Sequence, residues 1–321
     1  MSNNIVVLPR PSETPSTTPP SIKAPPEATF IEAFGNLLPP LYLQTPIGRA
    51  AYYELLPSVD SRQDSISRVL LVHGIQTCAI GLQRLASELS LRFPHAHIVW
   101  FDLWGHGLTD TPYVAHEPKL FHSLLNSLMA HLEWENAHVV GYSFGGSTTV
   151  TFANAYPERV ISMVLIAPAG LMRTAQFNEL EKSYLGGGPE EQAQAWILQW
   201  LEGGQLIVPA NWKERVGRGE LVSEAVRDWQ NRNHEGHKAS VVSMFRDGGC
   251  FDTHDEFAEV AKRGLNIKCI LGQLDDVCSE QDLCDVGIRN VSVIPETGHG
   301  VVRENVPEVA DLIEVFWRKI L

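Results

Sequence analysis

Six short apolar segments alternate with stretches of helical periodicity along the chain, and this pattern limits the fold more than any other feature. The segments are apolar throughout instead of alternating with polar residues. Such runs are typical of strands covered on both faces in a parallel sheet. We therefore predict an α/β fold, a doubly wound, mostly parallel central sheet with helices on both faces. The predicted strands are Val69 to His73, His97 to Asp102, His138 to Tyr142, Val160 to Ile166, Ile267 to Leu271 and Val291 to Ile294.

The residues that precede these strands predict a small antiparallel hairpin. The run L-Y-L-Q-T begins at Leu41, a P-I-G-R turn covers Pro46 to Arg49, and A-A-Y-Y-E-L-L follows. Between and after the strands, apolar residues at helical spacing predict helices, the last of them with Pro307 in its first turn. These helices are Leu120 to Glu135, Gly145 to Tyr156 and Val306 to Ile320.

One interval is too long for an ordinary crossover between neighbouring strands. It runs over residues 171–262 and contains helical stretches at Glu190 to Leu201, Leu221 to Asn231 and Lys238 to Phe245. We predict an inserted helical lid (cap) domain here, with residues 41–170 and 263–321 as the core domain. Trp196 and Trp200 in the lid either form an apolar roof over a substrate pocket or pack the lid onto the core.

The N-terminal residues differ in composition from the rest of the chain. The first 30 residues contain seven prolines and few large apolar side chains. Such a segment buries too little apolar surface to offset the entropy lost on ordering. Residues 1–40 are therefore predicted to be a disordered or draped tail, with a docking arm for a partner or for the lid as the alternative.

Charge and cysteine content exclude several classes of partner. The formal net charge is −13, which disfavours binding to nucleic acids or anionic membranes. The five cysteines form no C-x-x-C pair, and H-E-G-H at His234 to His237 lacks metalloprotease spacing. We therefore expect no metal and no cofactor, and we expect the two histidines to lie on a solvated face of the lid. No apolar run has the length of a membrane span or signal peptide. We expect a cytoplasmic protein whose translated and mature chains are the same; the sequence does not determine its oligomeric state.

The strongest chemical signal is G-Y-S-F-G-G at Gly141 to Gly146, which directly follows a predicted strand and begins a predicted helix. This context is that of a nucleophile elbow, in which small neighbours allow a tight turn to expose the central serine. Ser143 is the predicted nucleophile. A serine that only caps the helix is the alternative.

A serine nucleophile needs a base and a carboxylate that orients the base, and after such an elbow they follow in the order acid, then histidine. His299 lies in E-T-G-H-G after the last predicted strand and is the predicted base. The loop after the preceding strand reads L-G-Q-L-D-D-V-C. Asp275 is the predicted acid, with Asp276 as the alternative.

Acyl transfer also requires donors for the developing oxyanion. The predicted donors are the backbone N–H groups of Phe144 and of Ile75 in the loop H-G-I-Q-T-C, with Gln76 as a further possibility and as a pocket residue. His73 is expected to orient this loop by hydrogen bonding.

Five motifs together resemble the α/β-hydrolase superfamily, in its lidded serine esterase-like branch. They are L-V-H-G at Leu71, F-D-L-W-G-H-G-L-T-D at Phe101, G-Y-S-F-G-G at Gly141, G-Q-L-D at Gly272 and G-H-G-V-V-R-E-N-V-P at Gly298. The resemblance covers the chain from about Leu41 to Leu321. It implies that Asp102 to Gly107 form a structural turn, from which Trp104 reaches the pocket.

These observations predict a cofactor-free serine hydrolase acting on a carboxylic ester or lactone of a fairly apolar small molecule. Carbon–carbon bond hydrolysis on the same triad is the alternative. Two features of the ring-cleavage hydrolases are missing, because Ile75, Gln76 and Thr77 stand in place of Gly-Pro-Gly, and Gly300 in place of an aromatic residue. A ligand-sensing protein with slow turnover is a third possibility.

Overall fold

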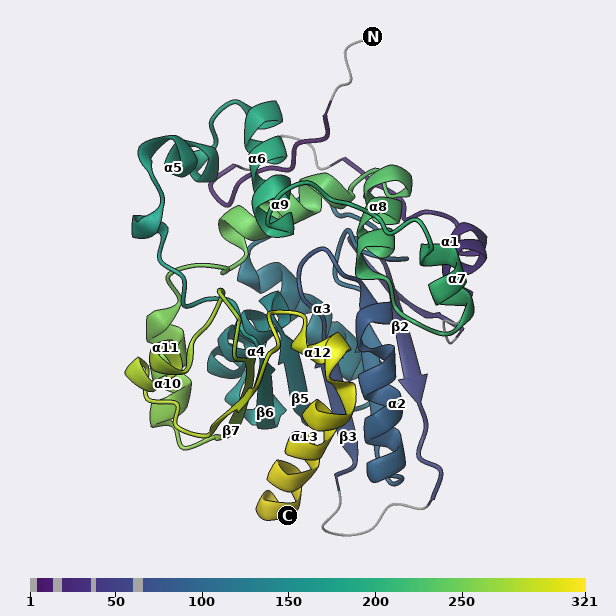
Figure 1. Ribbon diagram of the computed structural model, residues 1–321, viewed down its shortest axis with the longest axis vertical. Helices are drawn as coiled ribbons and strands as arrows, with labels where there is room; N and C mark the ends of the chain where they lie inside the picture. The colour runs from purple at the N-terminus through teal and green to yellow at the C-terminus, as the bar shows by residue number, and fades with distance from the viewer. Residues whose placement is uncertain (1–4, 14–18, 36–38, 60–65) are drawn as a thin grey trace.

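The computed structural model describes residues 5–13, 19–35, 39–59 and 66–321. Its strands form one eight-stranded sheet in the order β1-β2-β4-β3-β5-β6-β7-β8 (Figure 1). Within this part of the chain, no helix is long and apolar enough to cross a membrane. The strands are β1 (Leu41–Thr45), β2 (Gly48–Leu55), β3 (Arg68–Val72), β4 (His97–Phe101), β5 (Ala137–Tyr142), β6 (Val160–Ile166), β7 (Asn266–Gly272) and β8 (Val291–Ile294).

Most neighbouring strands are parallel. The hairpin partners β1 and β2 are antiparallel, and β2 is also antiparallel to β4, while every later pair is parallel. The central strands β3 and β5 therefore end at the same edge of the sheet, where loops that carry chemistry collect. The predicted fold class is confirmed.

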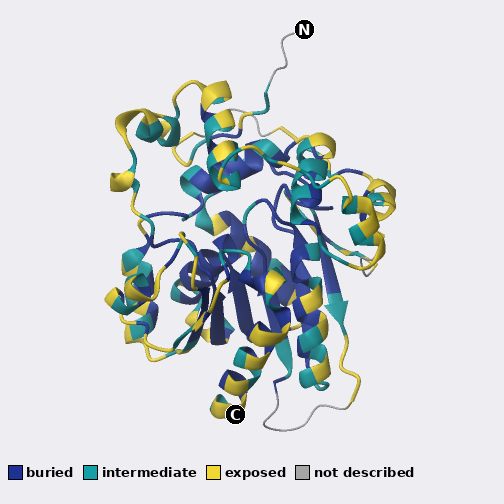
Figure 2. Ribbon diagram, in the orientation of Figure 1, coloured by how far each residue is buried: buried dark blue, intermediate teal, exposed yellow. Residues whose placement is uncertain are grey.

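The central strands β3 and β5 are mostly apolar because both of their faces are covered. Leu70 and Val72 of β3 point into one buried cluster, while Val69 and Leu71 point into another. This alternation is the period-2 geometry of a strand. Figure 2 accordingly shows the strands as the most continuously buried part of the molecule.

Helices cover both faces of the sheet. On one face lie α2 (Gln83–Arg92), α12 (Val301–Glu304) and α13 (Val306–Ile320), and α2 packs against α13. On the other lie α3 (Pro118–His131), α4 (Phe144–Ala155) and α10 (His254–Lys262), with α4 between the other two. The short helix α11 (Glu280–Asp285) precedes β8, and three 3-10 turns cover Ala79–Leu82, Pro157–Arg159 and Thr174–Gln176.

The inserted helices α5 to α9 lie at the upper end of the sheet in Figure 1 and occupy the interval predicted as a lid, so this segment is called the lid below. They are α5 (Glu179–Gly186), α6 (Glu190–Glu202), α7 (Trp212–Gly217), α8 (Ser223–Asn233) and α9 (His237–Asp247). The expected lid interval, 171–262, also contains α10, but this helix packs on α4 in the core, where Phe257 is buried. The chain thus packs on the core again at α10, before it enters the next strand, β7.

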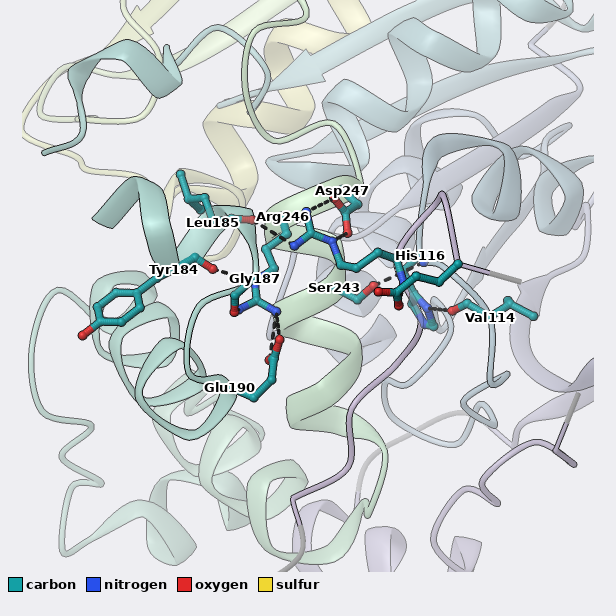
Figure 3. Close-up of polar contacts among 11 residues, drawn as sticks. Val114, His116, Tyr184, Leu185, Gly187, Glu190, Ser243, Arg246 and Asp247 are labelled. Carbon is teal, nitrogen blue, oxygen red and sulfur yellow. Dashed lines mark hydrogen bonds and ion pairs between the residues drawn. The ribbon is translucent and has the colours of Figure 1, made fainter. Parts of the chain in front are cut away.

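Arg246 connects the lid helices to one another (Figure 3). Its guanidinium donates to both carboxylate oxygens of Glu190 at 2.9 Å, to the Tyr184 carbonyl at 2.8 Å and to the Gly187 carbonyl at 2.9 Å. Nη1 makes both bonds to Glu190, while Nε and Nη2 bond the two carbonyls, so all three guanidinium nitrogens have partners. The lid therefore has its own internal support.

The described part of the N-terminal segment packs against the lid. Helix α1 (Glu27–Phe34) buries Phe30 and Phe34, which are 1% and 2% exposed, against Trp229 and Trp212 of the lid. Further upstream, Arg10 pairs with Asp247 of α9 at 2.7 Å. These contacts suit a draped segment or a docking arm, the two ordered alternatives considered from the sequence, and Phe30 and Phe34, one helical turn apart, make them. The tail residues 1–4, 14–18 and 36–38 lie outside the described residues.

Candidate active site

Ser143 lies in a strained turn between β5 and α4. Its φ of 54° and ψ of −119° are unusual for a residue with a side chain. The turn fits only because its neighbours are glycines. A Cβ on Gly141 would lie 2.3 Å from the Gly145 carbonyl oxygen, and one on Gly145 would lie 2.2 Å from that of Val72. The sequence motif thus encodes close backbone packing at this point.

Three side chains from distant parts of the chain meet here. Nε2 of His299 lies 2.9 Å from Oγ of Ser143. Nδ1 of the same ring lies 3.1 and 3.2 Å from the two carboxylate oxygens of Asp275. Imidazole geometry of this kind allows Nδ1–H to donate to the carboxylate while Nε2 accepts from the serine hydroxyl.

The two adjacent aspartates have different surroundings. The Asp275 side chain is 0% exposed, and its Oδ1 also accepts the Val277 N–H at 2.9 Å. Asp276 is exposed and lines the cavity described below. Of the two residues left open by the sequence, Asp275 is the one in contact with His299.

Histidines hold the loop expected to supply an oxyanion donor. Nε2 of His73 accepts the Leu103 N–H at 2.9 Å, so the neutral ring carries its proton on Nδ1, which lies 2.6 Å from the Gly74 carbonyl oxygen. Burial lowers the pKa of His73 to about 4, which favours this neutral form. His73 thus spans two loops at the ends of β3 and β4.

The expected oxyanion donors border the serine. Phe144 is the first residue of α4, where a backbone N–H has no acceptor within its own helix. Ile75 also lines the cavity. The Gln76 N–H, in contrast, donates to Nε2 of His106 at 3.2 Å. Of the two residues considered in that loop, Ile75 is therefore better placed than Gln76 to donate its N–H to an oxyanion.

A cavity of about 790 Å³ opens over Ser143 and His299. Trp196 and Trp200 line it, and both also pack against Phe245 of α9, a contact within the lid. Gln76, expected as a pocket residue, lines it as well.

Trp104 is not among the cavity-lining residues. It is 1% exposed, belongs to the buried cluster on one face of the sheet and packs beside Gly48 of β2. The tight turn after β4 directs this ring into the core instead of the pocket. Trp104 was expected to reach the substrate pocket, but its ring lies in the core instead.

The sequence analysis missed several polar residues of the cavity wall. Glu202 and Arg227, both from the lid, form an ion pair at 3.3 Å. Arg303 donates to the Tyr142 hydroxyl at 3.0 Å, and that hydroxyl donates to the His299 carbonyl at 3.1 Å. The position of Arg303, one helical turn after His299, was the available signal. Nothing local in the sequence marked the lid pair.

The H-E-G-H histidines are buried, and the expectation of a solvated face is wrong. The rings of His234 and His237 lie 2.8 Å from the Thr109 and Gly105 carbonyl oxygens, respectively. Both histidines therefore fasten the lid to the turn after β4. Across the described ranges, no group of three or more His, Cys, Asp or Glu side chains is arranged to hold a metal ion.

Comparison with known proteins supports the architecture. Residues 67–201 match the family model described as the alpha/beta hydrolase fold. An uncharacterised Mycobacterium tuberculosis protein is 28% identical over 105 residues, 33% of this chain and 30% of that protein. A 2-(acetamidomethylene)succinate hydrolase of Mesorhizobium japonicum is 29% identical over 143 residues, 44% of this chain and 50% of that protein. The matches thus span half or less of these relatives.

Three further likenesses cover more of the chain. A monoacylglycerol lipase of Mus musculus is 23% identical over 286 residues, 82% of this chain and 79% of the lipase. A meta-cleavage product hydrolase from Pseudomonas fluorescens IP01 has a TM-score of 0.59 at 21% identity, over 85% of this chain and 96% of that one. The enol-lactonase from Burkholderia xenovorans LB400 has a TM-score of 0.60 at 16% identity, over 86% and 99%. The chain therefore has the α/β-hydrolase fold, and its residues 67–201 match the family model of that fold.

Proposed function

We propose that this protein is a serine hydrolase that cleaves a carboxylic ester or lactone of a fairly apolar small molecule. The observation that carries the proposal is the contact of 2.9 Å between Oγ of Ser143 and Nε2 of His299, which in turn faces the buried Asp275. The contact lies at the base of a cavity large enough for a small-molecule substrate.

In the proposed reaction, Oγ of Ser143 attacks the substrate carbonyl carbon while Nε2 of His299 takes the hydroxyl proton. The carbonyl π electrons move to oxygen, where the N–H groups of Phe144 and Ile75 stabilise the negative charge. The intermediate collapses, the C–O bond breaks, and the departing alkoxide takes the proton from His299. Water then repeats the sequence on the acyl-enzyme, releasing the acid and restoring Ser143.

The cavity wall supports a substrate that is apolar over much of its surface. Trp196, Trp200 and Phe245 contribute aromatic surface, whereas Gln76 and Glu202 add polar groups beside it. Because the triad serves esters and lactones alike, the lid decides between them. The lactonase and lipase likenesses fit either choice. The five cysteines are free, and we place the protein in a reducing compartment, the cytoplasm.

The test is a panel of p-nitrophenyl esters, lactones, amides and carbon–carbon substrates, assayed with the wild-type protein and Ser143→Ala. We expect hydrolysis of an ester or lactone that Ser143→Ala abolishes while its circular dichroism is retained. A fluorophosphonate probe should label the wild type but not His299→Ala. Full activity of Ser143→Ala would contradict the proposal. Single turnover, with ligand-dependent protection of the lid from proteolysis, would favour the ligand-sensing alternative.

A further inference from the structure

Gln76 has a backbone conformation that its own residue type does not favour. Its φ is 66°, in the left-handed region, and it directly follows Ile75 in the loop beside Ser143. Such a conformation persists only where surrounding contacts enforce it. The contacts made by Gln76 therefore decide the course of this loop.

Two lid residues hold Gln76 from above. Nε2 of Gln230, in α8, donates to the Gln76 carbonyl at 2.7 Å, and Oε1 of Gln230 accepts the Gly107 N–H at 2.8 Å. Glu202, at the end of α6, accepts from Nε2 of Gln76 at 2.9 Å. Gln230 is 0% exposed, so no water replaces its bonds. Both ends of its amide are used, which fixes its orientation.

The core holds the two preceding peptide groups. The Gly74 carbonyl faces Nδ1 of His73 at 2.6 Å, and the Gln76 N–H donates to Nε2 of His106 at 3.2 Å. A peptide group is planar and trans, so a carbonyl held on one side directs its N–H to the other side. The Ile75 N–H, which shares its plane with the Gly74 carbonyl, thus points away from His73.

We propose that the lid completes the oxyanion hole, with Gln230 and Glu202 as positioning residues that act through Gln76 on the Ile75 N–H. This inference rests on the proposed function. The core makes one hydrogen bond to each peptide that flanks Ile75, and the lid, through Gln230, makes the hydrogen bond to the peptide after Gln76. The left-handed turn at Gln76 is therefore held by the lid as well as by the core. Displacement of α6 and α8 would free the Gln76 peptide, let the loop turn at Ile75 and weaken the alignment of one oxyanion donor with Ser143.

The test compares an oxygen ester with the corresponding thionoester, in which sulfur replaces the carbonyl oxygen. Sulfur accepts hydrogen bonds weakly, so the thionoester depends less on oxyanion donors. Gln230→Met and Glu202→Leu should each lower kcat for the oxygen ester by about 10- to 100-fold. The ratio of oxygen-ester to thionoester kcat should fall accordingly. Glu202→Gln keeps an acceptor for Gln76 and should hold that ratio near the wild-type value.

Ser243→Ala is the matched control, because it removes a different contact between lid and core. Oγ of Ser243, in α9, accepts the His116 N–H at 3.3 Å (Figure 3). It should lower the melting temperature without changing the kcat ratio. If Gln230→Met does not fold, Glu202→Leu and Glu202→Gln carry the test, since Glu202 lies at the cavity and, among the described residues, its carboxylate bonds the Gln76 side chain and the Arg227 guanidinium.

The outcomes separate the two proposals. A wild-type protein without Ser143-dependent hydrolysis would overturn the proposed function, and this inference with it. Ser143-dependent hydrolysis whose kcat ratio is the same in the wild type, Glu202→Leu and Gln230→Met would overturn only this inference. A ratio lowered in both variants, but not in Ser243→Ala, would establish the positioning role.

Discussion

Replacing Asp275 with asparagine should remove most of the catalytic rate while leaving the fold intact. The two side chains have the same shape, and the Asp275 carboxylate is fully buried between His299 and the Val277 N–H. In the variant, the amide oxygen has to stay with the Val277 N–H, since the amide nitrogen has no acceptor there. The amide nitrogen then takes the place of Oδ2, 3.2 Å from Nδ1 of His299.

That exchange reverses the hydrogen bond to the base. An amide nitrogen only donates, so Nδ1 has to accept and the imidazole proton moves to Nε2, which faces Ser143. A protonated Nε2 cannot take the serine proton. In triads of this kind, the wrong tautomer lowers kcat by about 10⁴-fold, or about 5 kcal/mol of transition-state stabilisation.

The assay is steady-state hydrolysis of the best ester in the panel, with the melting temperature measured alongside. Asp276→Asn is the paired variant, because it makes the same chemical change at the adjacent exposed position and should cost less than about tenfold in kcat. The reasoning would be refuted by an Asp275→Asn variant that retains kcat within tenfold of the wild type. A large loss in Asp276→Asn alone would move the acid to that residue.

Three further predictions concern stability. Burial lowers the pKa of four histidines, His73, His116, His122 and His138, to about 4, so the unfolded chain binds more protons than the folded one between pH 6.5 and 4. The contribution of these histidines to the free energy of unfolding should be complete above pH 6.5 and should have fallen by about 2 kcal/mol per histidine at pH 5. Asp102 offsets part of this loss, because burial raises its pKa to about 6 and the folded chain therefore binds its proton more tightly than the unfolded chain. A flat profile of melting temperature from pH 7.5 to 4.5 would contradict this. Phe34→Ala should lower the free energy of unfolding by about 3 to 5 kcal/mol in urea titrations, because the ring is buried against Trp212, and an unchanged midpoint would show that α1 is dispensable. Gly145→Ala should prevent stable folding, because its Cβ would meet the Val72 carbonyl, whereas Gly217→Ala in open space on α7 should fold normally and unfold at the wild-type midpoint or above.

The parts of the protein that could be predicted from sequence are those with a local signature. Mostly apolar runs located β6 and β8 at their observed bounds, although β6 is buried along most of its length and β8, at the edge of the sheet, is only partly buried. The glycines around Ser143 follow from a close approach of backbones within a short segment. The order of serine, acid and histidine follows from strand order. Each of these signals is contained in a few consecutive residues or in their sequence order.

The tertiary structure decided what depends on partners far away in the chain. Composition predicted a disordered or draped tail but not the surface it contacts, which depends on the aromatic partners of Phe30 and Phe34 about 200 residues later. Trp104 turns into the core because the turn after β4 leaves its ring space there.

Gln76 is the clearest example of a residue whose contacts come from distant parts of the chain. Its φ is left-handed, and its carbonyl and side chain bond Gln230 and Glu202, which no local sequence pattern connects with it. Sequence by itself determined the strands, the glycine-flanked turn at Ser143 and the order of the proposed triad residues, because backbone sterics and hydrophobic periodicity act between neighbours. Only the folded chain decided which distant groups pair, because buried hydrogen bonds and packing form between surfaces that the chain brings together once it has folded.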